Sequence, residues 1–254
     1  MKHALTDAQI IELFHLAFLQ VAQARLDQAR YVVKGGVSLR YFFESLRYSQ
    51  DLDLDAVAIE PWKLEEKVDE VLAAPAFGLL LRSAGLALEG VTKPERTATT
   101  QRWKPLIAVS GRREPVRTRI EISHRTADPR RILEAVPDRV VAPYALRAPT
   151  MQHYTADAAI EQKVRALAQR AQTQARDLFD LELLLRRHRD ALGAGQIDSS
   201  VLEAALDRVF ELPFEAFQDQ VVPFLDADAV ELYDDRAAWE QTQAFVAERL
   251  VELR

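Results

Sequence analysis

The sequence predicts an α+β fold in which a strand-containing lobe, residues 1–149, precedes an all-helical lobe, residues 150–254. Two observations predict this order. Strand-like apolar runs and two-residue alternation fall before Pro149, whereas apolar residues at helical spacing dominate after it. The stretch from Pro137 to Pro149 has the composition of a linker around a short strand at 139–142, so the border is placed at its end.

Composition narrows the class of protein. The 254 residues are 48% hydrophobic and 28% charged, as in ordinary globular proteins, and the absence of cysteine excludes disulfides, zinc–thiolate sites and thiol catalysis. The start has no signal-peptide pattern and no apolar run reaches the length of a membrane span, so we expect a cytoplasmic protein without membrane contact. The net charge of −6 argues against indiscriminate nucleic-acid binding but leaves room for a local basic groove.

An N-terminal helix is predicted between residues 7 and 22, where apolar side chains cover a broad helical face. Thr6 stands at the position of its N-cap. His15 lies inside this helix, and a lone helical histidine is expected to pack against its neighbours rather than to bind a ligand.

A strand, a glycine pair and a helix follow. Residues 31–33 form an apolar run short enough for a buried strand, and Gly35-Gly36 then allows a sharp turn or a close approach to a ligand. Helical spacing runs over residues 37–46, with Ser38 near the helix start, where free N–H groups and the positive end of the helix dipole favour an anion. Gly35, Gly36 and Ser38 are therefore candidates for binding phosphate.

Residues 51–55 read Asp-Leu-Asp-Leu-Asp, a strict two-residue period. As a strand, this segment buries Leu52 and Leu54 and presents three carboxylates on its other face. Carboxylates at this spacing can share two hard cations about 3.5–4 Å apart, the arrangement used in phosphoryl transfer. The alternative is an exposed, charged edge strand, which is common. The glycine pair and the helix start just upstream favour a phosphate and metal site.

Strands are predicted between residues 77 and 125. They begin at Leu79–Leu81 and continue over 98–109 and 116–123. In the last of them, alternation puts Glu121 on the polar face, either as a carboxylate of the site or as part of an ordinary solvent-exposed face. Arginines concentrate in this region and predict either an RNA-facing rim or counter-ions for an acidic protein: Arg112, Arg113, Arg117, Arg119, Arg125, Arg130 and Arg131.

A second group of charged residues lies in the helical lobe, on two predicted helices over residues 156–171 and 176–188. Lys163 is a mobile positive charge suited to a triphosphate. Asp177 and Asp180 are one helical turn apart, so either could bind a base or ribose, orient Lys163, or accept a proton from an attacking hydroxyl. Alternatively, the two aspartates and Arg176 form a buried ion-pair network that holds the helices together. Residues 197–254 predict further helices and show no site chemistry.

Two motifs in these segments resemble those of the AbiEii/AbiGii toxin nucleotidyltransferases, which belong to the polymerase-β-like nucleotidyltransferases. The first motif comprises Lys34-Gly35-Gly36, Leu39-Arg40 and Arg47-Tyr48-Ser49-Gln50-Asp51-Leu52-Asp53. The second comprises Glu161, Lys163, Ala166, Leu167, Arg170 and Arg176-Asp177-Leu178-Phe179-Asp180-Leu181. One position departs from the pattern, because Val37 stands where the family usually carries Ser or Thr, and Ser38 follows one place later.

The resemblance implies a polymerase-β-like lobe with a mixed sheet and a helical lobe that completes the active site. Asp51 and Asp53 would bind two Mg²⁺ ions, with Glu121 as the candidate third carboxylate from a neighbouring strand. Nucleotide-binding roles fall to Gly35, Gly36, Ser38, Lys163 and Asp180, and catalytic roles to Asp51, Asp53, Lys163 and Asp177.

The implied reaction is attack of an acceptor hydroxyl on the α-phosphate of an NTP, with release of pyrophosphate. The implied context is a toxin–antitoxin pair, with a cognate antitoxin as partner and the tRNA 3′ end as acceptor in some members. Transfer to a small molecule or protein remains an alternative. A further alternative is a catalytically inactive protein of the same fold that binds a nucleotide or a partner. Val37 at the hydroxyl position favours this alternative.

Overall fold

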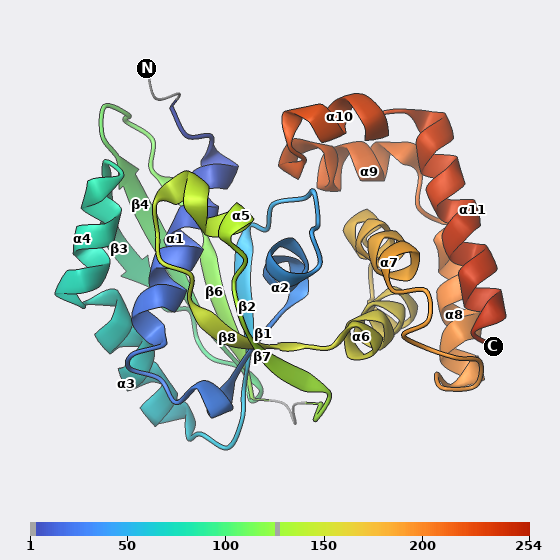
Figure 1. Cartoon of the computed structure of the whole chain (residues 1–254), viewed down its shortest axis with the longest axis horizontal. Helices are drawn as coiled ribbons and strands as arrows, with labels where there is room; N and C mark the ends of the chain where they lie inside the picture. Colours follow the sequence, from blue (N-terminus) through green and yellow to red (C-terminus); the bar gives the residue numbers. More distant parts are fainter. Residues whose placement is uncertain (1–3, 125–127) are drawn as a thin grey trace. The chain divides into compact units, whose positions relative to one another are not determined.

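The computed structural model describes residues 4–124 and 128–254, so Arg125 lies outside the described residues (Figure 1). The chain forms two compact units. The sheet unit comprises residues 1–44 and 48–154, and the helical unit comprises residues 45–47 and 155–254. Over the described ranges, no helix has both the length and the apolar character needed to cross a membrane.

The sheet unit is built on a mixed sheet that has eight strands in the described residues. The strands are β1 (Tyr31–Lys34), β2 (Asp51–Ala56), β3 (Leu86–Thr92), β4 (Thr100–Val109), β5 (Val116–Arg117), β6 (Arg119–Ser123), β7 (Arg131–Ala135) and β8 (Thr150–Tyr154). Their order is β3-β4-β6-β2-β1-β8-β7, with β5 pairing β4 outside this path. β2 is parallel to β6 and β1 is parallel to β8, while the other neighbours are antiparallel. The predicted α+β fold with a mixed sheet is confirmed.

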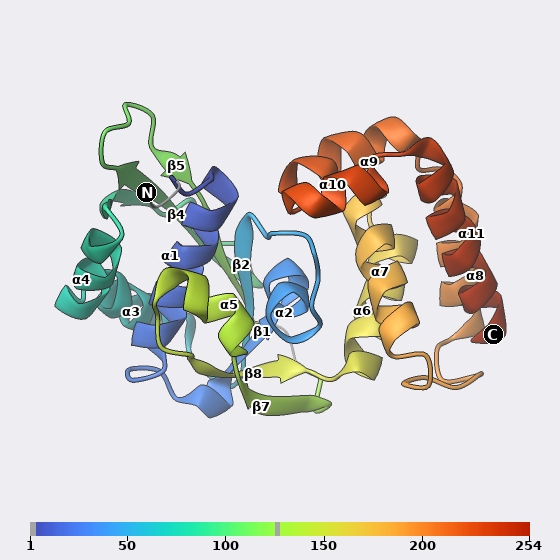
Figure 2. The same cartoon turned by 45° about the horizontal axis from the view of Figure 1, so that its top comes forward.

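Helices α1, α3 and α4 cover one face of this sheet (Figures 1 and 2). The helical elements of the sheet unit are α1 (Asp7–Ala22), α2 (Gly35–Phe42), α3 (Pro61–Leu72), α4 (Pro75–Ser83), α5 (Asp138–Val141) and the 3-10 turns η1 (Gln28–Arg30) and η2 (Ala142–Tyr144). As predicted, Thr6 caps α1, and a capping box with Gln9 satisfies backbone N–H groups that the first turn leaves free.

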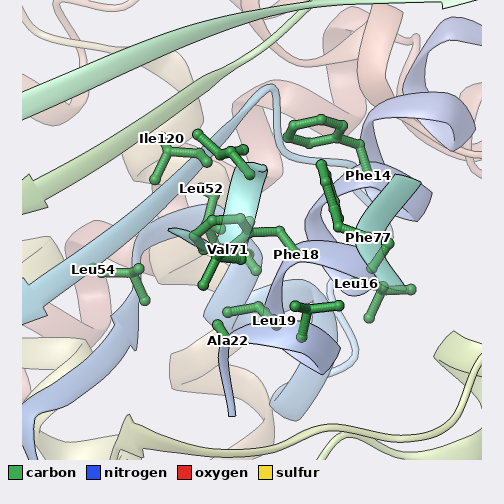
Figure 3. Packing of buried hydrophobic residues seen from close by; sticks show 14 of the residues in the cluster. Phe14, Leu16, Phe18, Leu19, Ala22, Leu52, Leu54, Val71, Phe77 and Ile120 are labelled. Carbon is green, nitrogen blue, oxygen red and sulfur yellow. The ribbon is translucent and has the colours of Figure 1, made fainter. Parts of the chain in front are cut away.

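The core lies between these helices and the sheet (Figure 3). Phe14 and Phe18 of α1 pack edge to face on Phe77 of α4, with ring centroids 5.2 and 6.5 Å apart. Leu52 of β2 and Ile120 of β6, both fully buried, meet this aromatic group from the sheet. Each such side chain removed from water contributes about 1.5–3 kcal/mol, so this layer holds β2 and β6 firmly in place.

Two segments predicted as strands are helices. Residues 79–81 belong to α4, where Pro75 starts the helix and Phe77 and Leu81, four residues apart, are buried on one face. Residues 139–142 likewise fall in α5 and η2, with Val140 buried. Short apolar runs fit a buried strand and a buried helix equally well, and flanking proline decides here.

The helical unit contains α6 (Ala156–Gln169), α7 (Ala175–Arg187), α8 (Ser199–Val209), α9 (Phe214–Gln220), α10 (Ala227–Tyr233), α11 (Arg236–Glu252) and the 3-10 turn η3 (Val222–Phe224). Helix α11 packs beside α7 and α8 (Figure 2). Trp239 of α11 stacks on Phe217 of α9, with ring centroids 4.7 Å apart, and donates its indole N–H to Leu212 O at 3.1 Å. Helix α10 was not predicted from the sequence.

The short segment 45–47 belongs to the helical unit although it lies between α2 and β2 in the chain. The helix predicted to reach Leu46 ends at Phe42, and Glu44 then adopts a positive φ of 56°. Beyond it, Leu46 O accepts a hydrogen bond from Asp226 N at 3.3 Å, and Arg47 forms an isolated β-bridge with Leu225. At the other border, β8 completes the sheet, so the sheet unit extends past Pro149 to Tyr154.

Candidate active site

Three carboxylates gather on the polar face of two parallel strands. In the register of β2 with β6, Asp51 lies beside Arg119 and Asp53 lies beside Glu121. Leu52 and Leu54 point to the opposite face and are buried in the core, as the alternation predicted. Because adjacent strands are about 4.8 Å apart, Asp53 and Glu121 are direct neighbours, and Asp51 lies two residues away on the same face of β2.

Asp53 has a perturbed acidity. Burial, together with the neighbouring charges of Asp51 and Glu121, raises the pKa of Asp53 to about 6, and Lys34 and Arg119 offset only part of this effect. Within the described part of the chain, no side chain donates a hydrogen bond to its carboxylate. Asp53 is therefore a carboxylate in a locally negative environment, where a positive charge would be favoured.

Two arginines form hydrogen bonds with Asp51 and Glu121, the carboxylates next to Asp53. Arg119 donates a hydrogen bond to Asp51, and Arg102 of β4 donates from Nε to Glu121 Oε2 at 2.7 Å. With the side chains so placed, no group of three or more potential ligands in the described residues is arranged around a metal position. The donor set itself fits Mg²⁺, a hard cation that binds carboxylate oxygens. To bind such an ion, Asp51 and Glu121 would have to exchange their arginine partners for it.

Asp55, the third carboxylate of the alternating segment, has a different environment. It is 7% exposed and accepts hydrogen bonds from Lys34 Nζ and from the Tyr154 hydroxyl, both at 2.6 Å. Lys34 also donates to Ser123 Oγ at 3.1 Å. These contacts tie β1, β2, β6 and β8 together, so Asp55 and Lys34 stabilise the sheet next to the site.

Gly35 lies against Asp53 at the start of α2. Its φ of +64° is in the left-handed region, and a Cβ built on it would lie 2.6 Å from Asp53 Oδ2. Only glycine satisfies both constraints. The structure thus brings the first residue of the predicted phosphate-binding segment into contact with a predicted metal ligand.

The remainder of that segment is buried at the N-terminus of α2. Ser38 is 4% exposed and Val37 is 2% exposed, with Val37 packed in the hydrophobic core. At the position where the resembling family usually carries a hydroxyl, this chain therefore uses an apolar core residue. The first turn of α2, including Gly36, offers backbone N–H groups that have no partner within the helix.

Lys163, Asp177 and Asp180 form a buried ion-pair network within the helical unit. Lys163 Nζ lies 2.7 Å from Asp180 Oδ2 and 3.0 Å from Asp177 Oδ1. Arg47 Nη2 lies 2.8 Å from Asp180 Oδ2, and Arg170 Nε lies 2.7 Å from Asp177 Oδ2 without hydrogen-bond geometry. The network joins α6, α7 and segment 45–47, and Asp180 is fully buried.

Charge pairing outweighs burial in this network. Burial alone would raise the pKa of Asp180, but the facing Arg47 and Lys163 hold it below its usual value. Burial would lower the pKa of Lys163, but Asp180 and Asp177 raise it above its usual value. Lys163 is therefore charged at neutral pH, and Asp180 is a poor proton acceptor. The predicted alternative placed Arg176 in such a network, but in the described residues its members are Arg47 and Arg170 instead.

Besides the pairing of Arg170, sequence reasoning missed the pairing of three further arginines in these two clusters. Arg102 and Arg119 reach the carboxylates across strand pairs whose order the sequence does not show. Arg47 meets Asp180 across 133 positions of the chain, and its Nε donates to Oδ1 at 3.3 Å while its Nη2 donates to Oδ2 at 2.8 Å. Each residue was visible as a charge in a motif or on a strand face, but its partner was visible only in the fold.

Comparisons with known proteins cover almost the whole chain. A family model described as "Nucleotidyl transferase AbiEii toxin, Type IV TA system" matches residues 17–248. The crystal structure of JHP933 from Helicobacter pylori is similar with a TM-score of 0.63 and 18% sequence identity, covering 97% of this chain and 91% of that chain. The structure of a protein named as a candidate nucleotidyltransferase from H. pylori has a TM-score of 0.59 and 18% identity, covering 100% and 99%. Curated protein sequences give no significant match.

Proposed function

Because the chain belongs to the AbiEii family of nucleotidyltransferase toxins of type IV toxin–antitoxin systems, we propose that it transfers a nucleoside monophosphate from an NTP to an acceptor hydroxyl with the help of Mg²⁺. The observation that carries this proposal is the contact of Gly35 with Asp53 on the carboxylate face of β2 and β6. It joins a glycine suited to a close phosphate approach to a carboxylate in a locally negative site.

In this proposal Asp51 and Asp53 hold Mg²⁺, with Glu121 as the third carboxylate. Bound Mg²⁺ supplies charge neutralisation at the α-phosphate and at the leaving pyrophosphate. The first turn of α2, with Gly35, Gly36 and Ser38, binds phosphate oxygens through backbone N–H groups at the positive end of the helix dipole. The acceptor oxygen bonds to the α-phosphorus as the bond to the β-phosphate oxygen breaks, and pyrophosphate leaves.

The helical unit contributes Lys163 in this proposal. Asp177 and Asp180 keep the ammonium charged and restrict its movement, and a restrained ammonium is suited to a phosphate group. Asp180 thereby acts on the nucleotide through Lys163. Asp177, which has the same partner, stays the candidate for catalysis within this pair.

The acceptor we propose is the 3′ end of tRNA, with transfer to a small molecule or a protein as the alternative. Family membership also implies a cognate antitoxin as a partner. A second candidate function is nucleotide binding without turnover. The observation that favours it is Val37, which is packed in the core where related toxins usually carry a hydroxyl.

One labelling experiment separates these functions. Purified protein is incubated with Mg²⁺ and each α-labelled NTP in the presence of total tRNA, a protein extract or a small-molecule extract. Label on tRNA that disappears in Asp51→Asn supports the proposal, and Asp7→Asn, an exposed carboxylate on α1, serves as the matched control. Label on another pool assigns a different acceptor. NTP binding without release of pyrophosphate under every condition supports the non-catalytic function.

A further inference from the structure

A hydrogen-bond chain links α1 to the residue that precedes Asp51. His15 Nε2 lies 2.8 Å from Thr118 Oγ1, and Thr118 Oγ1 lies 2.7 Å from the backbone oxygen of Gln50. His15 is 1% exposed and Thr118 is 6% exposed, so water does not compete for these bonds. Three residues that are distant in the sequence thus meet at the start of β2.

The direction of each bond follows from the available protons. The Gln50 carbonyl can only accept, so the single hydroxyl proton of Thr118 is donated to it. Thr118 Oγ1 must then accept from His15, which fixes the imidazole as the tautomer that carries its proton on Nε2. Burial lowers the pKa of His15 to about 3, so the ring stays neutral at physiological pH.

The chain lies just beyond the end of the β2–β6 pairing. That pairing begins with Asp51 opposite Arg119, and Gln50 and Thr118 are the residues immediately before them. Thr118 itself falls between β5 and β6. The Ser49 hydroxyl donates to Asp51 O at 2.9 Å. The backbone carbonyls on both sides of the Asp51 amide–Cα unit are therefore fixed by side-chain hydroxyls.

We propose that His15 and Thr118 are positioning residues for Asp51, which set the direction of its carboxylate for binding a divalent cation. The hydrogen bonds from His15 to Thr118 and from Thr118 to the Gln50 carbonyl form a clamp on the backbone that precedes Asp51. Because Thr118 also precedes Arg119, the same hydroxyl restrains the backbone of that residue. In metal sites, groups that orient a ligand in this way affect metal affinity strongly. This inference rests on the proposed role of Asp51 in the nucleotidyltransferase reaction.

The test compares Thr118→Val, which keeps the shape and removes the hydroxyl, with Thr118→Ser, which restores it. Thr242→Val, at another buried threonine in α11, is the matched control for loss of a buried hydroxyl. Binding of Mn²⁺ alone is measured by electron paramagnetic resonance. Pyrophosphate release is measured against Mg²⁺ concentration below the melting temperature of each variant. The His15 tautomer is read from ¹⁵N chemical shifts.

We expect Thr118→Val to weaken Mn²⁺ binding and to raise the half-saturating Mg²⁺ concentration about tenfold. Thr118→Ser and Thr242→Val should stay close to wild type. The inference is overturned if Thr118→Val lowers only the melting temperature, or if His15 carries its proton on Nδ1. If the wild type releases no pyrophosphate, the proposed function is wrong. Mn²⁺ binding by the variants then still tests whether His15 and Thr118 position Asp51. A wild type that binds no Mn²⁺ overturns both.

Discussion

At the residue scale, Asp53 is held in an environment that disfavours its ionised form. Burial, Asp51 and Glu121 raise its pKa to about 6, which is above the ordinary value of 3.8. The ionised carboxylate therefore lowers the free energy of unfolding at neutral pH, and a bound cation would offset this loss. This cost is expected at a site selected for ligand binding rather than for stability.

The cost predicts a pH-dependent gain in stability for Asp53→Asn. Because the folded-state pKa is raised, protonated Asp53 contributes stability below about pH 4 that is lost as the pH rises through about 6. Removing the charge should therefore raise the free energy of unfolding by about 1–3 kcal/mol at pH 8 and change it little at pH 4. Urea unfolding in EDTA measures both values. An equal effect at the two pH values would contradict the assignment of the perturbed charge.

Gly35 allows a sharper test, since it combines strain with a close contact. In Gly35→Ala, the φ of +64° and the 2.6 Å approach to Asp53 Oδ2 act together, so nucleotide transfer should be lost and stability should fall by about 1–3 kcal/mol. Gly111→Ala is the control, because Gly111 has a φ of +80° and no atom within 4 Å of the added Cβ. Equal activity in the two variants would show that the contact with Asp53 does not matter.

We expect Arg119 to compete with a metal ion for Asp51. Its guanidinium bonds to Asp51 and lies 3.8 Å from Glu121, so Arg119→Gln should bind Mn²⁺ more tightly than wild type when nucleotide is absent. Calorimetric titration measures this affinity, with Arg117→Gln, an exposed residue on the preceding strand, as the control. Weaker binding in Arg119→Gln would mean that the arginine supports the metal site rather than competing for it.

At the scale of elements, the buried network of α6 and α7 is a structural support of the helical unit. Lys163→Met leaves Asp177 and Asp180 buried with less compensating charge, so the free energy of unfolding should fall by about 3–5 kcal/mol. The loss should be smaller when Asp177→Asn is added, because the two changes remove opposite charges of one pair. Urea unfolding of both variants checks this. Additive effects would show that the pair is not coupled.

Periodicity predicted those elements in which one face is clearly buried. Asp51 to Asp55 alternates so strictly that the strand, its buried leucines and its carboxylate face followed directly. The strand predictions for residues 79–81 and 139–142 were wrong because a short apolar run shows no period. In each case a helix begins at or directly after a preceding proline. Pairing partners such as Arg102 and Glu121 depend on strand order, which the local sequence does not contain.

At the scale of the whole molecule, two motifs placed the chain in its family because each keeps several residues at fixed spacing. The family model matches residues 17–248, so the similarity to the family extends beyond both motifs. The border between the units is harder to predict from the sequence than the family, because it depends on contacts between distant residues. β8 pairs with β1 across more than a hundred residues, and segment 45–47 joins the helical unit through contacts with Leu225 and Asp226.

We propose the carboxylates of β2 and β6 as the catalytic centre of a Mg²⁺-dependent nucleotidyltransferase. Pyrophosphate release from NTP by wild type and Asp53→Asn, each with Mg²⁺ and with EDTA, tests this claim most directly. We predict that either EDTA or the substitution lowers the rate by about a hundredfold or more, since a metal ion contributes several kcal/mol to transition-state stabilisation. A wild-type rate in Asp53→Asn, with the fold intact, would contradict the claim.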